Sequence, residues 1–374
     1  MFIVSAADTL GAIAADVRAT IGFTDGTNHR SIAIYCLDGQ ASTSTHRNGS
    51  DGAPIYVDGV GSAAFVEWIT DGVRLSHSGF PDGNLVTVHF FTDADVTDAK
   101  VFHQDLGSTT SQQEFTSMGF ELDAMFLAQN YISSFAGYAN APLGFGCVIN
   151  DNPTTPTQKS IAWCADSGSS SGDQNTRASD SEALIATLIG STRWRLTISD
   201  IDSAGFSFTN SGSTGTQMIG LALKFAPGVE LALVDSQIPT TGDYSQAGVG
   251  FEPEFGVMAH IVGPSAYNTL DTGGNGASFS ITSFDDAAVY SNSFSDHDGA
   301  ATTVCKSLTA GQFRLLENDG TDAVVASGHS FDADGWDFPL TTNPSNPILG
   351  WAFAYSSGGA PATGPDLLLG AAGV

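Results

Sequence analysis

The sequence contains three imperfect copies of one pattern, and this repetition constrains the fold more than any other feature. In each copy an apolar or acidic run precedes a glycine, and an alternating, strand-like segment follows it; the three glycines are Gly72, Gly205 and Gly335. The aromatic residues that close the copies, Phe90, Phe225 and Tyr355, follow the glycines after 18, 20 and 20 residues. A recurring spacing of this kind predicts repeated structural units. We expect the glycine to take a positive φ or to let two backbones cross.

Shared residues earlier in each copy extend the alignment. Gly-Phe at 22–23 and Ser-Ile-Ala at 31–33 reappear at 144–145 and 160–162, and the third copy keeps the pattern loosely as SFSITSF at 278–284. The segments between them, such as RWRLTIS and QMIGLALKF, alternate or are rich in β-branched and aromatic residues, as strands are. The segment 179–190 has helix-like ends, but its counterparts do not, so we favour a strand or a single turn.

These patterns predict an all-β protein of three tandem β-sandwich, jelly-roll-like units. The expected boundaries are 1–95, 96–228 and 229–358, followed by a Gly/Ala-rich C-terminal tail at 359–374. Tandem β units with short loops are expected to form a rigid rod.

The first unit is predicted to lack its N-terminal strand. The second and third units share an upstream element, MGFELDAMFLA at 118–128 and VGFEPEFGVMA at 249–259, whereas residue 1 falls in the middle of the corresponding element. An unpaired sheet edge invites association. Either a strand from a neighbouring subunit or the chain's own tail, GPDLLLGAAGV, could fill the gap. We favour strand exchange between subunits through residues 364–374.

The charge and the cysteines limit the setting in which the protein works. The chain has 12 Lys and Arg against 40 Asp and Glu, a formal net charge of −28, which disfavours nucleic acid and anionic membranes as partners. No apolar run approaches the roughly 18 residues of a membrane span, and the N-terminus lacks the early positive charge of a signal peptide. Four cysteines are too few for a disulfide scaffold, and we expect Cys147 and Cys164 to be buried thiols rather than a bonded pair.

A search for chemistry finds no catalytic or metal-binding motif, so we expect no enzyme activity. His46 and Arg47, in the polar segment STHRNGSDG, are candidate ligand contacts. Arg47, Arg177 and Lys306 each precede an apolar run by eight residues. Such a cation can pin a loop by pairing with a neighbouring carboxylate, which we favour, or it can contact a neighbouring subunit or an acidic glycan.

Two further groups of residues are weaker candidates. Acidic loops could bind calcium through oxygen ligands, but none has the spacing of a calcium-binding loop, so turns are favoured and no cofactor is expected; the candidate ligands are Asp296, Asp298, Asp319 and Asp322. Four of the five tryptophans are expected in the core. Trp336 directly follows the turn glycine, so it is the candidate sugar-stacking platform.

The aligned pattern, with its Gly-Phe strands, the SIAW segment, the basic position and the SFDADG turn, resembles a repeated β-rich module of tailed-bacteriophage virion surface proteins. The resemblance implies a structural protein on the outer surface of the virion, as a capsid decoration, spike or tail-associated protein that stabilises the particle or attaches it to the host. It implies assembly in the host cytoplasm and partners that include other virion proteins, copies of the chain itself (a homo-oligomer, with a trimer as one option) and host surface glycan. The alternatives are a tail-fibre receptor-binding protein and a secreted or surface lectin-like adhesin.

Overall fold

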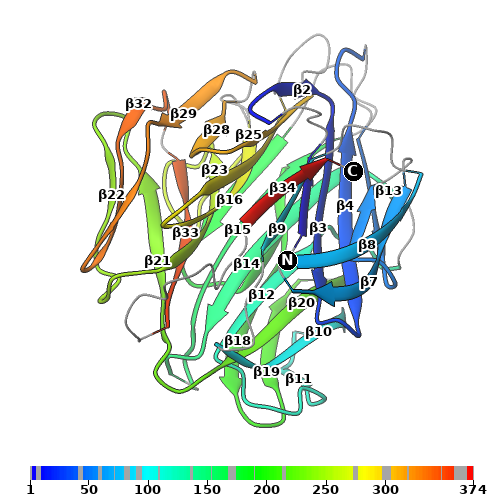
Figure 1. Cartoon of the computed structure of the whole chain (residues 1–374). Coiled ribbons are helices and arrows are strands. Elements are labelled where there is room, and N and C mark those ends of the chain that lie inside the picture. Colours follow the sequence, from blue (N-terminus) through cyan, green and yellow to red (C-terminus); the bar gives the residue numbers. More distant parts are fainter. Residues whose placement is uncertain are drawn as a thin grey trace.

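The all-β prediction is confirmed by the computed structural model (Figure 1). The structure describes residues 2–5, 10–40, 45–57, 61–70, 72–79, 85–89, 95–107, 110–134, 138–152, 154–166, 174–188, 190–212, 216–272, 277–296, 305–317, 320–346, 348–357 and 369–373. These residues form 34 strands and no helix. The segment 179–190 contributes a strand, β17 (Leu184–Leu188), as expected.

Three seven-stranded antiparallel sheets have the same strand order, and we call them the first, second and third inner sheets. The first runs β13 (Tyr138–Ala139), β5 (Thr45–Ser50), β4 (His29–Cys36), β3 (Val17–Thr24), β1 (Phe2–Ser5), β9 (Leu85–His89) and β34 (Leu369–Gly373). The second runs β24 (Leu270–Asp271), β16 (Gln174–Ser179), β15 (Thr157–Ala165), β14 (Ala141–Ile149), β12 (Ala124–Gln129), β20 (Thr216–Phe225) and β10 (Val96–Leu106). The third runs β2 (Ile13–Ala15), β27 (Cys305–Ala310), β26 (Val289–Asp296), β25 (Ala277–Asp285), β23 (Phe255–Val262), β33 (Ile348–Ser356) and β21 (Glu230–Ile238).

Smaller outer sheets face the inner sheets across separate apolar clusters. In the first unit the outer sheet is β6 (Ile55–Val57), β7 (Gly61–Ile69) and β8 (Gly72–Ser78). In the second it is β11 (Gln113–Phe115), β19 (Phe206–Ser211), β18 (Ser191–Ile201) and β17. The third unit has two outer sheets, β22 (Tyr244–Gln246) with β31 (Gly335–Phe338) and β30 (Ser330–Asp332), and β28 (Arg314–Leu316) with β29 (Asp322–Ala326) and β32 (Leu340–Thr342).

The three inner sheets share one hydrophobic core, so the units do not form a rod. Buried apolar residues from all three sheets belong to a single contiguous cluster. Aromatic rings cross between sheets: the ring centroids of Phe126 and Phe353 lie 5.2 Å apart, and Phe145 lies 5.2 Å from Trp351. Because burial of apolar area is the main driving force of folding, a shared core binds the units into one body. The expected rod is therefore wrong.

Short strands cross from each unit to another and close the arrangement into a ring. β13, which follows β12 of the second unit, pairs with β5 of the first unit. In the same way β24 of the third unit pairs with β16 of the second, and β2 of the first unit pairs with β27 of the third. Each junction thus has backbone pairing in addition to the shared core.

A strand from the C-terminal tail occupies one edge of the first inner sheet. β34 pairs antiparallel with β9, from Leu369 opposite His89 to Gly373 opposite Leu85, and Figure 1 shows it in red beside β9. β10 occupies the same place on β20, and β21 occupies it on β33. Within one chain the tail therefore completes the first inner sheet. Exchange of this strand between subunits stays a prediction.

The strand register corrects the alignment of the shared Gly-Phe residues. Ser31 lies opposite Gly22, whereas its counterpart Ser160 lies opposite Gly146 rather than Gly144. A Cβ at Gly22 would lie 1.6 Å from the carbonyl oxygen of Pro54, and a Cβ at Gly146 would lie 1.9 Å from that of Ala183. Both positions therefore need glycine because an outer strand crosses there.

Candidate functional site

The three basic residues lie on corresponding strands but at different positions. Arg47 is the third residue of β5, Arg177 the fourth of β16 and Lys306 the second of β27. Neighbouring positions on a strand point to opposite faces of the sheet. The three cations are therefore not one repeated site, which corrects the alignment made from the sequence.

Arg47 holds a segment of the second unit against the first. Its Nε donates a hydrogen bond to the carbonyl oxygen of Tyr131 at 3.1 Å, and Nη1 donates to the carbonyl oxygens of Ala139 and Asn140. The guanidinium also lies over the Tyr131 ring, 5.7 Å from its centroid, a favourable geometry for a cation. Arg47 is 8 % exposed, so its donors serve the junction between units. The backbone of His46 pairs with Ala139; its side chain lies outside the described residues.

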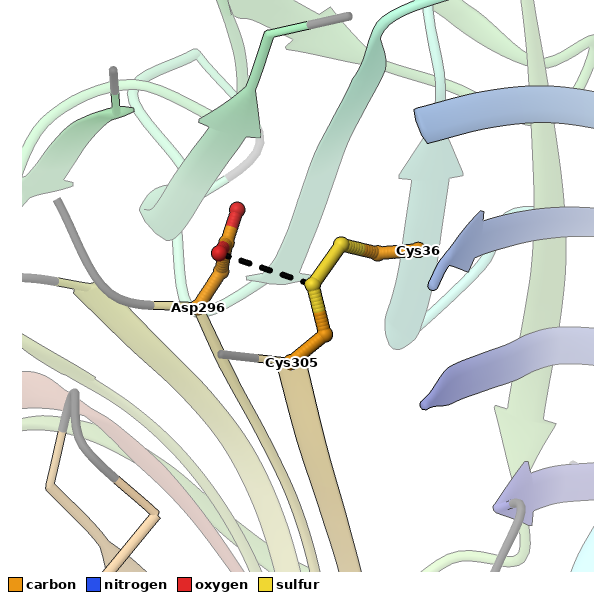
Figure 2. A group of neighbouring side chains, drawn as sticks. All are labelled: Cys36, Asp296 and Cys305. Atoms are coloured by element: carbon orange, nitrogen blue, oxygen red, sulfur yellow. Dashed lines mark hydrogen bonds between the residues drawn. A yellow bond between two sulfur atoms is a disulfide. The ribbon is translucent and has the colours of Figure 1, made fainter. Parts of the chain in front are cut away.

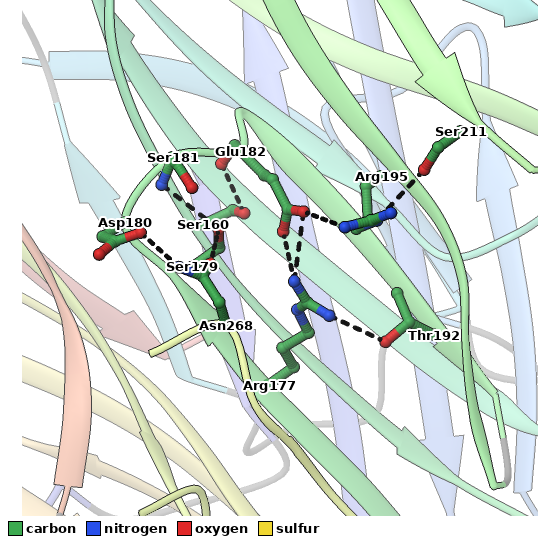
Figure 3. A network of polar contacts seen from close by, with 10 residues as sticks. All are labelled: Ser160, Arg177, Ser179, Asp180, Ser181, Glu182, Thr192, Arg195, Ser211 and Asn268. Carbon is green, nitrogen blue, oxygen red and sulfur yellow. Dashed lines mark hydrogen bonds and ion pairs between the residues drawn. The ribbon is translucent and has the colours of Figure 1, made fainter. Parts of the chain in front are cut away.

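Arg177 is part of a buried network around one carboxylate (Figure 3). Its Nη2 donates to both carboxylate oxygens of Glu182, at 3.0 and 3.2 Å, and Nη1 donates to the Thr192 hydroxyl. Arg195 donates to Glu182 from the other side at 3.2 Å. The buried carboxylate is thus neutralised by two cations, as burial requires. Here the loop-pinning interpretation fits the contacts.

The same network touches the third unit through Asn268. The Ser179 hydroxyl donates to Oδ1 of Asn268 at 2.7 Å, and Nδ2 of Asn268 donates to Asp180 at 2.6 Å. The hydrogen bond from Asn268 lowers the pKa of the Asp180 carboxyl. Asn268 has a φ of 62°, a left-handed conformation that asparagine tolerates better than most residues. This polar contact fixes the junction between the second and third units.

Lys306 joins the third unit to the first. Its ammonium group donates to Oδ2 of Asp38 at 2.6 Å, and the backbone N–H of Cys305 donates to the other oxygen of the same carboxylate at 3.0 Å. The Asp38 backbone N–H in turn donates to Asp16 at 2.8 Å. The loop-pinning interpretation fits this residue too, and the loop that it pins belongs to another unit.

A disulfide joins the first and third units where the sequence predicts none. Cys36, at the end of β4, is bonded to Cys305, at the start of β27 (Figure 2). Oδ1 of the buried Asp296 lies 3.5 Å from Sγ of Cys305. The two cysteines and Asp296 have the spacing of a metal-ligand cluster, but sulfur atoms bonded to each other are not thiolate ligands. Four cysteines are thus too few for a disulfide scaffold but enough for one bond, which was not predicted from the sequence.

Cys147 and Cys164 are free and buried, which confirms the prediction of two thiols. β14 and β15 pair, but Cys147 lies opposite Lys159 and Cys164 lies opposite Pro142, so the two sulfurs do not face each other. Burial raises the pKa of the Cys147 thiol well above its usual value. A thiol of this kind is inert.

The candidate calcium ligands do not form an oxygen cage in the described part of the chain. Asp296 is beside sulfur, and Asp322 forms an ion pair with Arg314, whose Nε and Nη2 donate to it at 2.6 and 3.1 Å. Both carboxylates therefore have structural roles. Asp298 and Asp319 lie outside the described residues.

Trp336 is not a sugar platform, because its side chain is fully buried in the third unit. It packs edge-on against Phe284 with the ring centroids 5.1 Å apart. The exposed tryptophan is Trp68, at 47 %, whereas the other four are at most 1 % exposed. Sequence reasoning missed Trp68 because its alternating strand has the same pattern as its buried counterparts. The signal that was available is its position in the unit that the sequence predicts to lack a strand.

A Ser–His pair in the third unit has the atoms of a nucleophile and its base but no access to a substrate. The Ser236 hydroxyl is 2.7 Å from Nε2 of His260 and 2.5 Å from the Tyr244 hydroxyl. Ser236 and His260 are 0 % exposed and Tyr244 is 1 % exposed. Burial lowers the pKa of His260 to about 3, so the imidazole is neutral at physiological pH. The group is a sealed polar network in a core.

The described residues include no helix long and apolar enough to cross a membrane. No protein-family model, curated protein or solved structure matches this chain. Some of the site residues predicted from the sequence lie in the described part of the chain. These residues form contacts between strands and between units, and they do not line a common cleft.

Proposed function

We propose that this protein is a structural component of the outer surface of a tailed-bacteriophage virion. The observation that carries the proposal is the use of its polar residues. Arg47, Lys306 and Asn268 each hold one unit against another, and the buried Tyr244 and His260 belong to a sealed network. Such an arrangement serves mechanical integrity better than catalysis.

The surface charge supports the same role. A net charge of −28 makes copies of the protein repel one another and repel packaged nucleic acid, so many copies can occupy one particle without non-specific aggregation. The disulfide between Cys36 and Cys305 suits a protein that works after release from the cell, because disulfides persist in oxidising surroundings. Stabilisation of the particle and attachment to the host are both compatible with this position.

The location of the protein on purified particles tests the proposal. Particles from a lysate of the host are purified on a density gradient and labelled with gold-conjugated antibodies against the chain. We expect gold on the outside of intact particles, over the capsid for a decoration protein or over the tail for a tail-associated one. Absence of the chain from gradient-pure particles would reject the proposal.

A glycan array with the purified chain separates the receptor-binding alternative from a purely structural role. Saturable binding to a host polysaccharide, combined with gold on the tail, would assign host recognition. Binding to glycans by a chain that is absent from the particles would instead favour the lectin-like adhesin.

A further inference from the structure

In the second and third units an additional strand pairs with the edge of an outer sheet. β11 pairs with β19, placing Phe115 opposite Phe206, and β22 pairs with β31, placing Gln246 opposite Trp336. After the additional strand the chain contacts the turn of the outer-sheet hairpin, β18–β19 in the second unit and β30–β31 in the third. The N–H of Met118 donates to the carbonyl oxygen of Ala204 at 3.0 Å, and the N–H of Val249 donates to the carbonyl oxygen of Asp334 at 3.1 Å. The outer edge of β19 and of β31 is therefore paired.

The repeated glycine exists because this additional strand crosses over it. A Cβ at Gly205 would lie 1.7 Å from the carbonyl oxygen of Phe115, and a Cβ at Gly335 would lie 1.8 Å from that of Gln246. Both explanations expected from the sequence hold here, because Gly205 and Gly335 each have a φ of +157° in addition to the crossing backbone. In these two units glycine therefore occurs where the additional strand crosses the outer sheet. We call the sheet edge that this strand pairs with the strand slot.

The first unit has the glycine without the strand. Gly72 begins β8, and among the described residues β8 pairs with β7 alone. The nearest atoms to a Cβ at Gly72 would be Cγ1 and Cδ1 of Ile69, at 3.9 and 4.0 Å. Gly72 is not among the residues with positive φ. Neither its conformation nor its described surroundings require glycine, so an absent partner strand is the remaining structural reason.

Apolar side chains around this slot are more exposed than their counterparts. Trp68 is 47 % exposed, whereas Ile201, at the same place in the second unit, is 2 % exposed. Val73 and Leu75 are partly buried, whereas the counterpart of Val73, Phe206, is 3 % exposed. Val66 and Ile69 add to the exposed apolar area, at 49 % and 47 %. An apolar patch beside a strand edge that no described residue pairs with is typical of a protein-binding surface.

The two occupied slots define what an incoming segment must provide. Each brings an aromatic ring onto an aromatic residue of the receiving strand: Phe115 stacks on Phe206 with the centroids 5.3 Å apart, and Tyr244 stacks on Phe338 at 6.1 Å. After the strand comes Met-Gly-Phe at 118–120 or Val-Gly-Phe at 249–251. The second of these residues is glycine with a positive φ in both cases.

We propose that the edge of β8 binds an extended segment from another polypeptide by strand addition. The segment pairs antiparallel from Gly72 onward, places an aromatic side chain over Val73 or Leu75, and continues into an aliphatic-Gly-Phe sequence. An acidic residue opposite Arg74 suits this edge: the Arg74 side chain pairs with Glu67 but is still 62 % exposed, and Glu114 holds the corresponding position in the second unit. The inference concerns the isolated chain and does not depend on the virion proposal.

Titration of the purified chain with a synthetic peptide tests this inference. The peptide SQQEFTSMGFE, residues 111–121, contains no tryptophan, so protein emission reports on Trp68, which is exposed while the other four tryptophans are buried. We expect saturable binding with a blue shift of the emission, because the segment covers Trp68 and Val73. The same peptide with Ser in place of Phe115, and a scrambled peptide, should bind at least tenfold more weakly. A Trp68→Phe chain should bind without the shift.

Gly72→Ala is the decisive variant. Its Cβ has room in the free chain, so the melting temperature should not change, but the Cβ collides with the carbonyl of an incoming strand and should weaken binding at least tenfold. Failure of the peptide to bind, or binding that Gly72→Ala leaves unchanged, would overturn the proposal. A dimer of the chain alone that Gly72→Ala dissociates would also overturn it, because a second copy would then occupy the slot.

Discussion

Cys36, the last residue of β4, is bonded to Cys305, the first residue of β27, and this bond joins the first inner sheet to the third across 269 residues of sequence. It lies next to the pairing of β2 with β27 and next to the ion pair between Lys306 and Asp38. The junction between the first and third units therefore has a covalent bond, backbone pairing and an ion pair.

Removal of this disulfide is expected to destabilise the protein without unfolding it. A crosslink restricts the unfolded chain, and the double substitution Cys36→Ser/Cys305→Ser should lower the free energy of unfolding by about 2–5 kcal/mol. Urea unfolding followed by circular dichroism measures the change. A reductant should shift the wild-type midpoint toward that of the variant and leave the variant unmoved. Equal midpoints for both proteins, with and without reductant, would contradict the bond.

Deletion of residues 364–374 is expected to leave β9 with an unpaired edge. β34 gives β9 its outer partner along five residue pairs, so its loss should lower the melting temperature and increase aggregation. Adding the deleted segment as a peptide should restore the melting temperature. Light scattering coupled to size exclusion decides where the strand comes from: an oligomer that becomes monomeric on deletion indicates exchange between subunits, whereas an unchanged mass indicates pairing within one chain.

Much of the fold follows from patterns of residues that are local in sequence. The alternation in RWRLTIS and the bounding Gly and Asn residues are enough to predict strands, because the two faces of a strand meet different surroundings. The repeat also predicts a gap at one edge of the first unit, and β34 lies at an edge of its inner sheet. Each of these features follows from residues that are neighbours in the chain. They can therefore be predicted from one sequence without knowledge of the contacts between segments.

Contacts between units could not be predicted in the same way. Arg47 and Arg177 look alike in sequence, but one binds carbonyl groups of another unit and the other binds Glu182. Cys36 and Cys305 are distant in the chain, and no spacing rule connects them. Trp68 and Trp336 both lie in strand-like runs, but Trp68 is 47 % exposed and Trp336, on a strand that pairs with β22, is fully buried. Such outcomes depend on which segments meet in three dimensions.

The repeated glycine gives a matched pair of substitutions. Gly205→Ala places a Cβ 1.7 Å from the carbonyl of Phe115 at a residue whose φ is +157°, and the overlap and the backbone strain together should cost about 1–3 kcal/mol of stability. Gly72→Ala meets open space among the described residues and should change stability by less than about 0.5 kcal/mol. Chemical denaturation of the two variants side by side makes the measurement. Equal losses would show that neither the crossing backbone nor the positive φ of Gly205 distinguishes it from Gly72.

The buried His260 is expected to make the protein less stable in mild acid. Its pKa is about 3 in the folded protein because burial disfavours the charged form, whereas an unfolded histidine has a pKa of about 6.5. Above pH 6.5 the residue is neutral in both states and has no effect. Between pH 6.5 and 3 the unfolded state binds a proton that the folded state does not, so stability falls by about 1.4 kcal/mol per pH unit, or about 2 kcal/mol at pH 5.

The substitution His260→Gln isolates this effect from the titration of the many carboxylates. The variant should be less stable than the wild type at pH 7.5, because the hydrogen bond between His260 and Ser236 is perturbed. The difference in unfolding free energy should shrink by about 2 kcal/mol between pH 7.5 and 5, since the variant has no imidazole to protonate. His77→Gln, at an exposed position on β8, controls for the loss of a surface histidine. A difference between wild type and His260→Gln that does not vary with pH would mean that His260 is hydrated and titrates normally in the folded protein.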